Sequence, residues 1–277
     1  MEFRLLGPVE LRVDGAPVAL AGQLPRALLA VLLVHANRVV ATERLIASLW
    51  GSTPPRTARG VLQNQVWRLR RALAGSGRHG RLVSQPPGYL LRVDPGELDL
   101  EVFGRLADQG RVALAAGEAE DAGRLLRMAL ELWRGRPFED VEVPALADRR
   151  ARLEERRLAA VEDRVEADLA RGRHADVVAE LEALVADEPL RERLWGQLML
   201  ARYRLGRQAD ALEAYRALRA RLVDRLGIEP GPELQRLEQA ILRADRSLDA
   251  PERTAAPGPG GGGSGAATGR RRRLRRP

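Results

Sequence analysis

The sequence predicts a mainly α-helical protein with a small N-terminal β component, followed by an all-α domain of helical repeats. Short apolar runs fill residues 3–21, and one of them alternates at the period of a β-strand. Beyond residue 22, apolar side chains mostly recur at the three- and four-residue steps of helices. Gly172 and Gly206 stand 34 residues apart with matching apolar positions behind them. That spacing is typical of a tetratricopeptide repeat, in which two antiparallel helices form each unit.

The charge of the chain is unevenly distributed. With 277 residues, 45 % of them apolar, the chain is long enough for two domains with real cores. Residues 1–97 carry 13 Arg against 6 acidic residues, residues 98–252 carry 26 against 32, and residues 253–277 carry 7 Arg and no acid. A phosphate-binding surface is therefore expected at the front of the chain, with the tail as a second candidate.

Several kinds of chemistry are excluded by composition. All 46 basic residues are Arg, and there is no Cys, so a Schiff-base lysine, a Walker A lysine, a thiol nucleophile and a cysteine zinc site cannot occur. His35, His79 and His174 lack metal-ligand spacing. No apolar run approaches the roughly 20 residues of a membrane span, and the first residues do not form a signal peptide. We therefore expect a soluble cytoplasmic protein that is not an enzyme and needs no cofactor or metal.

The first fifty residues predict a sheet and two helices. Strands are expected at 3–6, 9–13 and 18–20, with a turn at Asp14-Gly15 between the last two. A helix from Gln23 to His35 is apolar on nearly every side and should be buried. The next helix, Thr42–Trp50, is expected to be capped by its first residue.

A third helix, from Thr57 to about Ala74, carries apolar side chains on one face and polar or basic side chains on the other. Its apolar residues recur at steps of three and four and form one stripe, and its opposite face carries no acid. Arginine and amide side chains can make bidentate hydrogen bonds to guanine and adenine edges in the major groove. We interpret this as a DNA recognition helix; the alternative is a basic, solvated helix face. The outward residues are Gly60, Gln63, Asn64, Trp67, Arg68 and Arg71.

A β-hairpin follows the third helix. Residues 82–84 and 89–93 are two short β runs, joined through Pro-Pro-Gly. Strands, three helices with the third one basic, and then a hairpin form the order of a winged helix.

The stretch from Gln23 to Val93 resembles the OmpR-type winged helix-turn-helix, in the version found in the Streptomyces antibiotic regulatory protein family. The resemblance rests on Arg44-Leu-Ile-Ala-Ser-Leu-Trp-Gly51, Thr57-Ala-Arg59, Arg68-Leu-Arg-Arg-Ala-Leu73 and Gly88-Tyr-Leu90. It implies that the third helix enters the major groove and that the wing touches the DNA backbone or minor groove. The DNA-binding residues would then be Thr57, Arg59, Gln63, Asn64, Trp67, Arg68 and Arg71 on the helix, with Tyr89 and Arg92 on the wing.

Trp67 departs from the smaller or polar residue expected at its position. Three interpretations remain open for it: contact with thymine methyl groups, contact with sugars, or packing against a neighbouring subunit.

Residues 98–248 are expected to form three helical repeats. Gly117, Gly172 and Gly206 are each followed at +5, +9 and +12 by apolar or small residues. The first copy stands 55 residues before the second, so it contains an insertion of 21 residues, mostly Arg134–Pro144 and the start of the helix that follows. Gly227 should end the last repeat, and a further helix to about Ala244 should cap the stack.

This half resembles the bacterial transcriptional activation domain that follows the winged helix in the same family. The resemblance rests on Trp133-Arg-Gly-x-Pro-Phe138 and Leu226-Gly-Ile-Glu-Pro-Gly-Pro-Glu-Leu234. Together the two resemblances imply a sequence-specific DNA-binding activator of a secondary-metabolite (antibiotic) gene cluster. They imply binding to direct repeats in double-stranded DNA near promoters, as a homodimer or tandem assembly, and recruitment of RNA polymerase holoenzyme in the cytoplasm, at the nucleoid.

A tetratricopeptide-type adaptor with a basic docking domain is the alternative function. The acid-free outer face of residues 57–74 distinguishes the two functions, because an adaptor has no need of Gln, Asn and Arg there without one acid.

The expected domains are 1–97, the winged helix-turn-helix, and 98–248, the helical repeats, followed by a Gly/Pro linker and Arg-rich tail at 249–277. Arg270–Arg276 is either a solvated charge run or a non-specific DNA contact.

Overall fold

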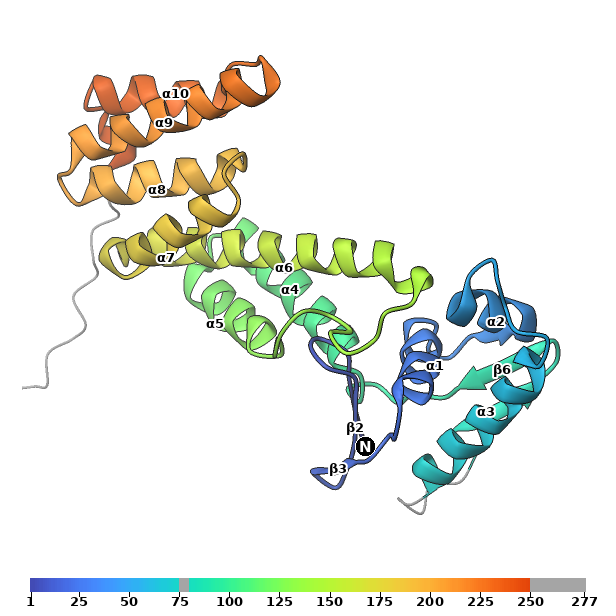
Figure 1. Cartoon of the computed structure of the whole chain (residues 1–277). Helices are drawn as coiled ribbons and strands as arrows, with labels where there is room; N and C mark the ends of the chain where they lie inside the picture. Colours follow the sequence, from blue (N-terminus) through green and yellow to red (C-terminus); the bar gives the residue numbers. More distant parts are fainter. Residues whose placement is uncertain (75–79, 250–277) are drawn as a thin grey trace, which may run out of the picture.

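The computed structural model describes residues 1–74 and 80–249, so the predicted tail falls almost wholly outside the described residues (Figure 1). In Figure 1 the N-terminal part, residues 1–97, lies at the lower right, and the repeat part, residues 98–249, extends from the centre to the upper left, with the long helix α6 (Pro144–Ala170) across the middle of the view. The mainly helical fold with small N-terminal sheets confirms the predicted fold class. No helix in the described ranges is long and apolar enough to cross a membrane.

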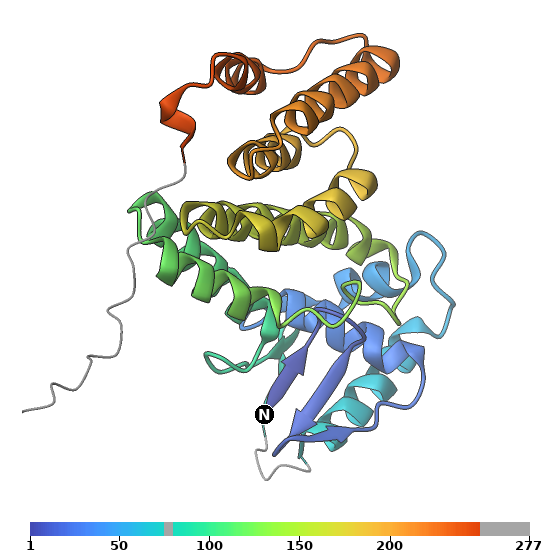
Figure 2. The ribbon, with the colours of Figure 1, turned by 90° about the vertical axis from the view of Figure 1, so that its left-hand side faces the viewer.

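The first sheet is an antiparallel meander of β1 (Glu2–Arg4), β2 (Glu10–Val13) and β3 (Ala16–Val18). Asp14 and Gly15 both adopt positive φ angles, of 49° and 79°, which confirms the predicted turn. Figure 2 shows this sheet in the angle between the winged helix and the first repeat helices. Its position there gives it contacts with both parts of the chain.

Three helices form the core of the N-terminal part: α1 (Gln23–Val34), α2 (Thr42–Trp50) and α3 (Ala58–Ala74). α1 is buried from Ala27 to Leu33, as its all-round apolar sequence predicts. The expected cap of α2 is wrong. The N-cap position belongs to Ala41, and the Thr42 hydroxyl donates instead to the carbonyl of Pro87 at 3.2 Å. This bond ties α2 to the hairpin.

The wing is a three-stranded sheet, where the sequence predicted only a hairpin. β5 (Leu82–Gln85) and β6 (Gly88–Leu91) form the hairpin, and β4 (Val39–Ala41) pairs with β6 to give the order β4-β6-β5. β4 was missed because three residues show no period of their own. Gly88 is required in this sheet, since a Cβ atom there would stand 1.9 Å from the Val40 carbonyl oxygen.

The repeats are three antiparallel helix pairs with a capping helix, as predicted. Gly117, Gly172 and Gly206 turn the chain within the pairs, with φ angles of 79°, 75° and 77°. At each turn, the N–H of the following residue bonds to the carbonyl five residues earlier, at 2.9 to 3.0 Å. The pairs are α4 (Asp99–Ala115) with α5 (Ala119–Leu130), α6 (Pro144–Ala170) with α7 (His174–Asp187), and α8 (Glu192–Arg204) with α9 (Gln208–Leu226), and α10 (Pro232–Leu242) caps them.

The 21-residue insertion in the first repeat contacts the N-terminal part. The backbone N–H of Arg134 donates to the Leu6 carbonyl at 2.8 Å, and that of Phe138 donates to the Leu5 carbonyl at 3.0 Å. Gly7 permits this approach, because a Cβ atom there would stand 3.1 Å from the Cβ of Arg134. The segment Trp133–Phe138, which carries one of the motifs found in the sequence, is thus hydrogen-bonded to the chain just after β1.

The two parts share one hydrophobic core. Buried side chains form a continuous cluster from Phe3 to Ala167, and a second cluster runs from Val165 to Ile241. The predicted domain boundary at residue 97 therefore falls at a packed interface, where Phe3 bridges to Leu98. The boundary between the two hydrophobic clusters lies within α6.

Candidate nucleic-acid interface

The α3 helix presents the face that its sequence predicts. Leu62 and Leu69 are fully buried against the core, and the five residues expected to face DNA are exposed. No acidic residue occurs in α3. The exposed residues are Gln63, Asn64, Trp67, Arg68 and Arg71.

Trp67 is an unusual residue for such a face, because 58 % of its side chain is exposed. The guanidinium of Arg71 lies over the indole ring, 5.6 Å from its centroid, in a cation–π contact. A hollow of about 350 Å³ adjoins this pair, between the C-terminal half of α3 and the start of β5. The contact leaves much of the indole open to a ligand on the outside of α3.

Arg70 links α3 to the wing. Its Nε donates to the carbonyl of Leu82 at 2.9 Å, and its Nη2 donates to the Ser84 hydroxyl at 2.8 Å. These bonds hold the first wing strand against α3, so the two elements would meet DNA at a defined angle. The sequence analysis missed this role, since the arginine pattern of α3 does not distinguish Arg70 from its neighbours.

The remaining helix residues predicted to bind DNA lie at the start of α3. Thr57 is exposed immediately before the helix, and its carbonyl accepts the N–H of Val61 at 3.0 Å. Arg59 is exposed and pairs with Glu43 of α2. Because ion pairs between exposed side chains contribute little, Arg59 can exchange this partner for a phosphate at small cost.

The two predicted wing residues differ in accessibility. Tyr89 lies in the central strand β6 and is half-buried against the core, so the wing tip is formed by Pro86 and Pro87 rather than by Tyr89. Arg92 is exposed just after β6, and its backbone N–H donates to the Arg81 carbonyl at 2.9 Å. Arg92 is thus the more accessible of the two.

Arg81 anchors the base of the wing from inside the protein. Its guanidinium is buried and contacts both carboxylate oxygens of Glu97, at 2.6 and 2.8 Å, and one of Asp94, at 2.9 Å. Burial opposes the charge, but the hydrogen bonds and charges of these two acids outweigh it and raise the pKa of Arg81. Sequence analysis missed this arginine, because its acidic partners lie beyond the hairpin.

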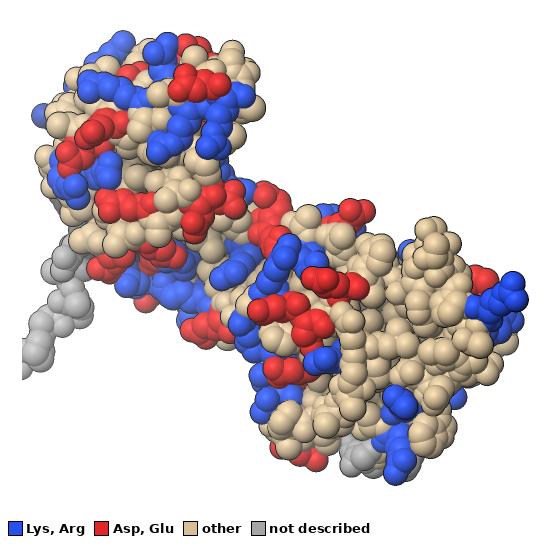
Figure 3. Space-filling view, viewed as in Figure 1, with Lys and Arg blue, Asp and Glu red and all other residues tan. Residues whose placement is uncertain are grey.

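The charges of the repeat part are largely matched within it. In Figure 3, basic and acidic side chains are interspersed over the repeats. Arg191 binds Glu162 at 2.6 Å and Glu155 at 2.8 Å, which raises the pKa of Arg191, the Glu162 bond being the main cause. Such internal pairing makes the repeats a poor surface for a polyanion.

Comparison with known proteins identifies both parts. Residues 18–91 match the family model of the "transcriptional regulatory protein, C terminal", and residues 98–242 match the "bacterial transcriptional activator domain". The regulatory protein DnrI of Streptomyces peucetius is 41 % identical over 266 residues, which cover 92 % of this chain and 98 % of DnrI. The chain belongs to the Streptomyces antibiotic regulatory protein family. It is therefore a transcriptional regulator, and the resemblance inferred from its motifs is confirmed.

Longer proteins contain a region similar to this chain. The regulatory protein AfsR of Streptomyces coelicolor is 44 % identical over 249 residues, which cover 90 % of this chain and 25 % of AfsR. A solved structure of Mycobacterium tuberculosis EmbR, in complex with a low-affinity phosphopeptide, superposes with a TM-score of 0.85 at 41 % identity. That match covers 88 % of this chain and 65 % of the EmbR chain.

Proposed function

We propose that this regulator binds double-stranded DNA in a sequence-specific manner through α3 and the wing. The observation that carries the proposal is the acid-free outer face of α3, on which Gln63, Asn64, Arg68 and Arg71 are all exposed. Amide and guanidinium groups are the donors and acceptors that distinguish base pairs in the major groove. Arg59, near the start of α3, and Arg92, just after β6, would contact phosphates, which would add affinity without specificity.

Membership of the family supports a proposal for the gene target and the mode of assembly. We infer that the protein activates a secondary-metabolite (antibiotic) gene cluster from the cytoplasm, at the nucleoid. Direct repeats near the promoter would bind two copies in the same orientation, as a homodimer or tandem assembly. The helical repeats of the protein would contact the second copy and RNA polymerase holoenzyme. Their charges are paired with one another, which favours protein partners over DNA.

The orientation of the two parts supports this division of labour. The backbone hydrogen bonds of the segment Trp133–Phe138 and the shared core hold the helical repeats at one angle to α3. A rigid connection lets DNA position the repeats beside a promoter, whereas a flexible one would leave their direction undefined.

The proposal is tested with the full chain and sheared genomic DNA from the organism that encodes it. Fragments retained by the purified protein are sequenced, and the enriched motif is placed upstream of a promoter in a transcription assay with purified polymerase holoenzyme. We expect a directly repeated motif, protection of both copies and promoter-dependent activation. Retention without any sequence preference would contradict specific binding and favour the adaptor. Specific binding without activation would contradict the recruitment of polymerase but leave the proposal of specific DNA binding intact.

A further inference from the structure

The repeat part contains a cavity that DNA binding does not use. It has a volume of about 780 Å³ and lies between α8 and α10, with one wall from the end of α6. Leu169, Leu200, Leu234 and Leu237 give it a mostly apolar lining. Sites for small molecules in proteins typically have volumes of about 300–1,000 Å³ and similar linings.

Beside the cavity, α8 and α10 approach each other closely at Gly196. A Cβ atom on Gly196 would stand 3.3 Å from Leu234 Cδ1 and 3.7 Å from Leu237 Cδ2, so a side chain there would intrude on the α10 wall. Glu192 fixes the start of that wall by accepting the Gly231 N–H at 2.7 Å. The wall is thus anchored at its N-terminal end, and a molecule between the helices would bridge α8 to α10.

Among the arginines that line the cavity, Arg204 is half-buried and has no ion pair in the described residues, whereas Arg236 is exposed. The lining also carries the acids Glu166, Glu192 and Glu233. Arg204, at the end of α8, lines the cavity, and its Nε and Nη1 donate to the carbonyls of Leu248 and Leu169 at 2.8 and 3.1 Å. It forms no ion pair with any acid in the described part of the chain. The charge of Asp249 raises the pKa of Arg204 without such a contact. By contrast, Arg193 on the same wall is paired with Asp163 and with Glu166, each at 2.6 Å.

Arg204 is half-buried at the cavity wall. Burial lowers the pKa of Arg204, although the charge of Asp249 acts in the opposite direction. The buried His174 also has a lowered pKa, first because of its burial and second because of the Arg204 charge. A half-buried cation beside an apolar cavity gains most from an anion that brings its own apolar body.

We propose that this cavity binds a small amphiphilic organic anion, with its apolar body between α8 and α10 and its carboxylate or sulfonate group against Arg204. The site is independent of α3 and goes beyond the proposed DNA-binding function. Such a ligand would fasten the last helix of the repeats and stabilise the folded protein by mass action.

A matched pair of fluorescent probes tests the charge directly. 8-Anilino-1-naphthalenesulfonate carries a sulfonate on the same ring skeleton as the neutral N-phenyl-1-naphthylamine. Arg204→Gln should weaken sulfonate-probe binding to the full chain roughly tenfold, because a charge-assisted contact is lost. Its affinity for the neutral probe should stay within about twofold, which also shows that the cavity remains folded. Arg204→Lys keeps the charge and should retain sulfonate binding.

Two further variants locate the site. Ala170→Phe places a ring at the α6 wall and should abolish high-affinity binding of both probes, whereas Arg216→Gln, an exposed change on α9 outside the cavity, should leave both unaltered. The proposal would be overturned if Arg204→Gln weakened the binding of both probes equally. It would also be overturned if Ala170→Phe left the affinity for both probes unchanged. It would also fail if truncation after Asp249 raised sulfonate affinity tenfold, since the tail would then be the natural occupant.

Discussion

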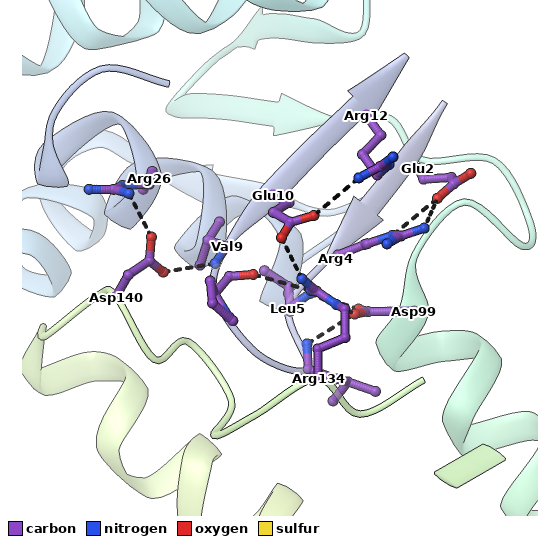
Figure 4. Close-up of polar contacts among 12 residues, drawn as sticks. Glu2, Arg4, Leu5, Val9, Glu10, Arg12, Arg26, Asp99, Arg134 and Asp140 are labelled. Carbon is purple, nitrogen blue, oxygen red and sulfur yellow. Dashed lines mark hydrogen bonds and ion pairs between the residues drawn. The ribbon is translucent and has the colours of Figure 1, made fainter. Parts of the chain in front are cut away.

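The carboxylate of Asp99, the first residue of α4, accepts the backbone N–H of Leu5 on both oxygens, each at 2.8 Å (Figure 4). It also accepts the N–H of Leu6 at 2.9 Å. Burial raises the pKa of Asp99, and these amides together with the charge of Arg134 offset part of that effect. One side chain of the repeat part therefore satisfies two backbone donors of the N-terminal part.

Asp99→Asn should lower the free energy of unfolding by about 1–3 kcal/mol, because the amide nitrogen would face a backbone N–H and leave a buried donor unsatisfied. Urea denaturation followed by circular dichroism measures the change. Asp148→Asn, an exposed change on α6, is the matched control and should leave the midpoint unaltered. Equal midpoints for the two variants would contradict the role given to Asp99.

Arg68→Ala should weaken binding to the preferred operator by about 1–3 kcal/mol and relax specificity at one base pair. The reason is that Arg68 is exposed in the middle of α3, on the face predicted to enter the major groove. Fluorescence anisotropy on operator and random duplexes measures both effects, with Arg225→Ala on α9 as control. A loss that is equal on the two duplexes would make Arg68 a phosphate contact instead.

The exposed indole of Trp67 is expected to contact a thymine methyl group. Replacing the contacted thymine by deoxyuridine removes only that methyl, and should weaken wild-type binding by about 0.8 kcal/mol, the contribution of one buried carbon. Trp67→Ala should bind both duplexes equally. If no such substitution along a single operator copy affects the wild type, the contact is with sugars or with a neighbouring subunit. A Trp67→Ala defect confined to tandem sites would favour the subunit.

His174 should make stability fall in mild acid. Burial and the Arg204 charge lower its pKa below the ordinary value of 6.5, so the unfolded chain takes up a proton before the folded protein does. Stability is therefore full above about pH 6.5 and is lost as the pH falls, by up to about 1.4 kcal/mol for each pH unit from this residue. Urea midpoints of wild type and His174→Gln between pH 8 and pH 5 measure it. Parallel curves throughout would exclude the effect.

Much of the interface was predictable from sequence. The stripe of Leu62, Val66, Leu69 and Leu73 lies on one side of α3 because an ideal helix brings such positions together, so the opposite residues had to be exposed. The three repeat turns were recognisable for a similar reason. Each needs a glycine at positive φ, and the apolar positions that follow it depend only on the period of the next helix.

The tertiary structure decided which parts support the interface. Asp99 lies 94 residues from Leu5, and Arg134 lies 124 residues from Glu10, which it binds at 2.7 Å. No local pattern marks such pairs, since their partners are backbone groups or single side chains brought together by packing. The same holds for β4, for Arg81 beneath the wing and for the position of Arg204 at the cavity. Periodicity along the chain determines which face of a helix is exposed, whereas the charges and hydrogen bonds that a residue finds depend on contacts that form only when the distant segments pack.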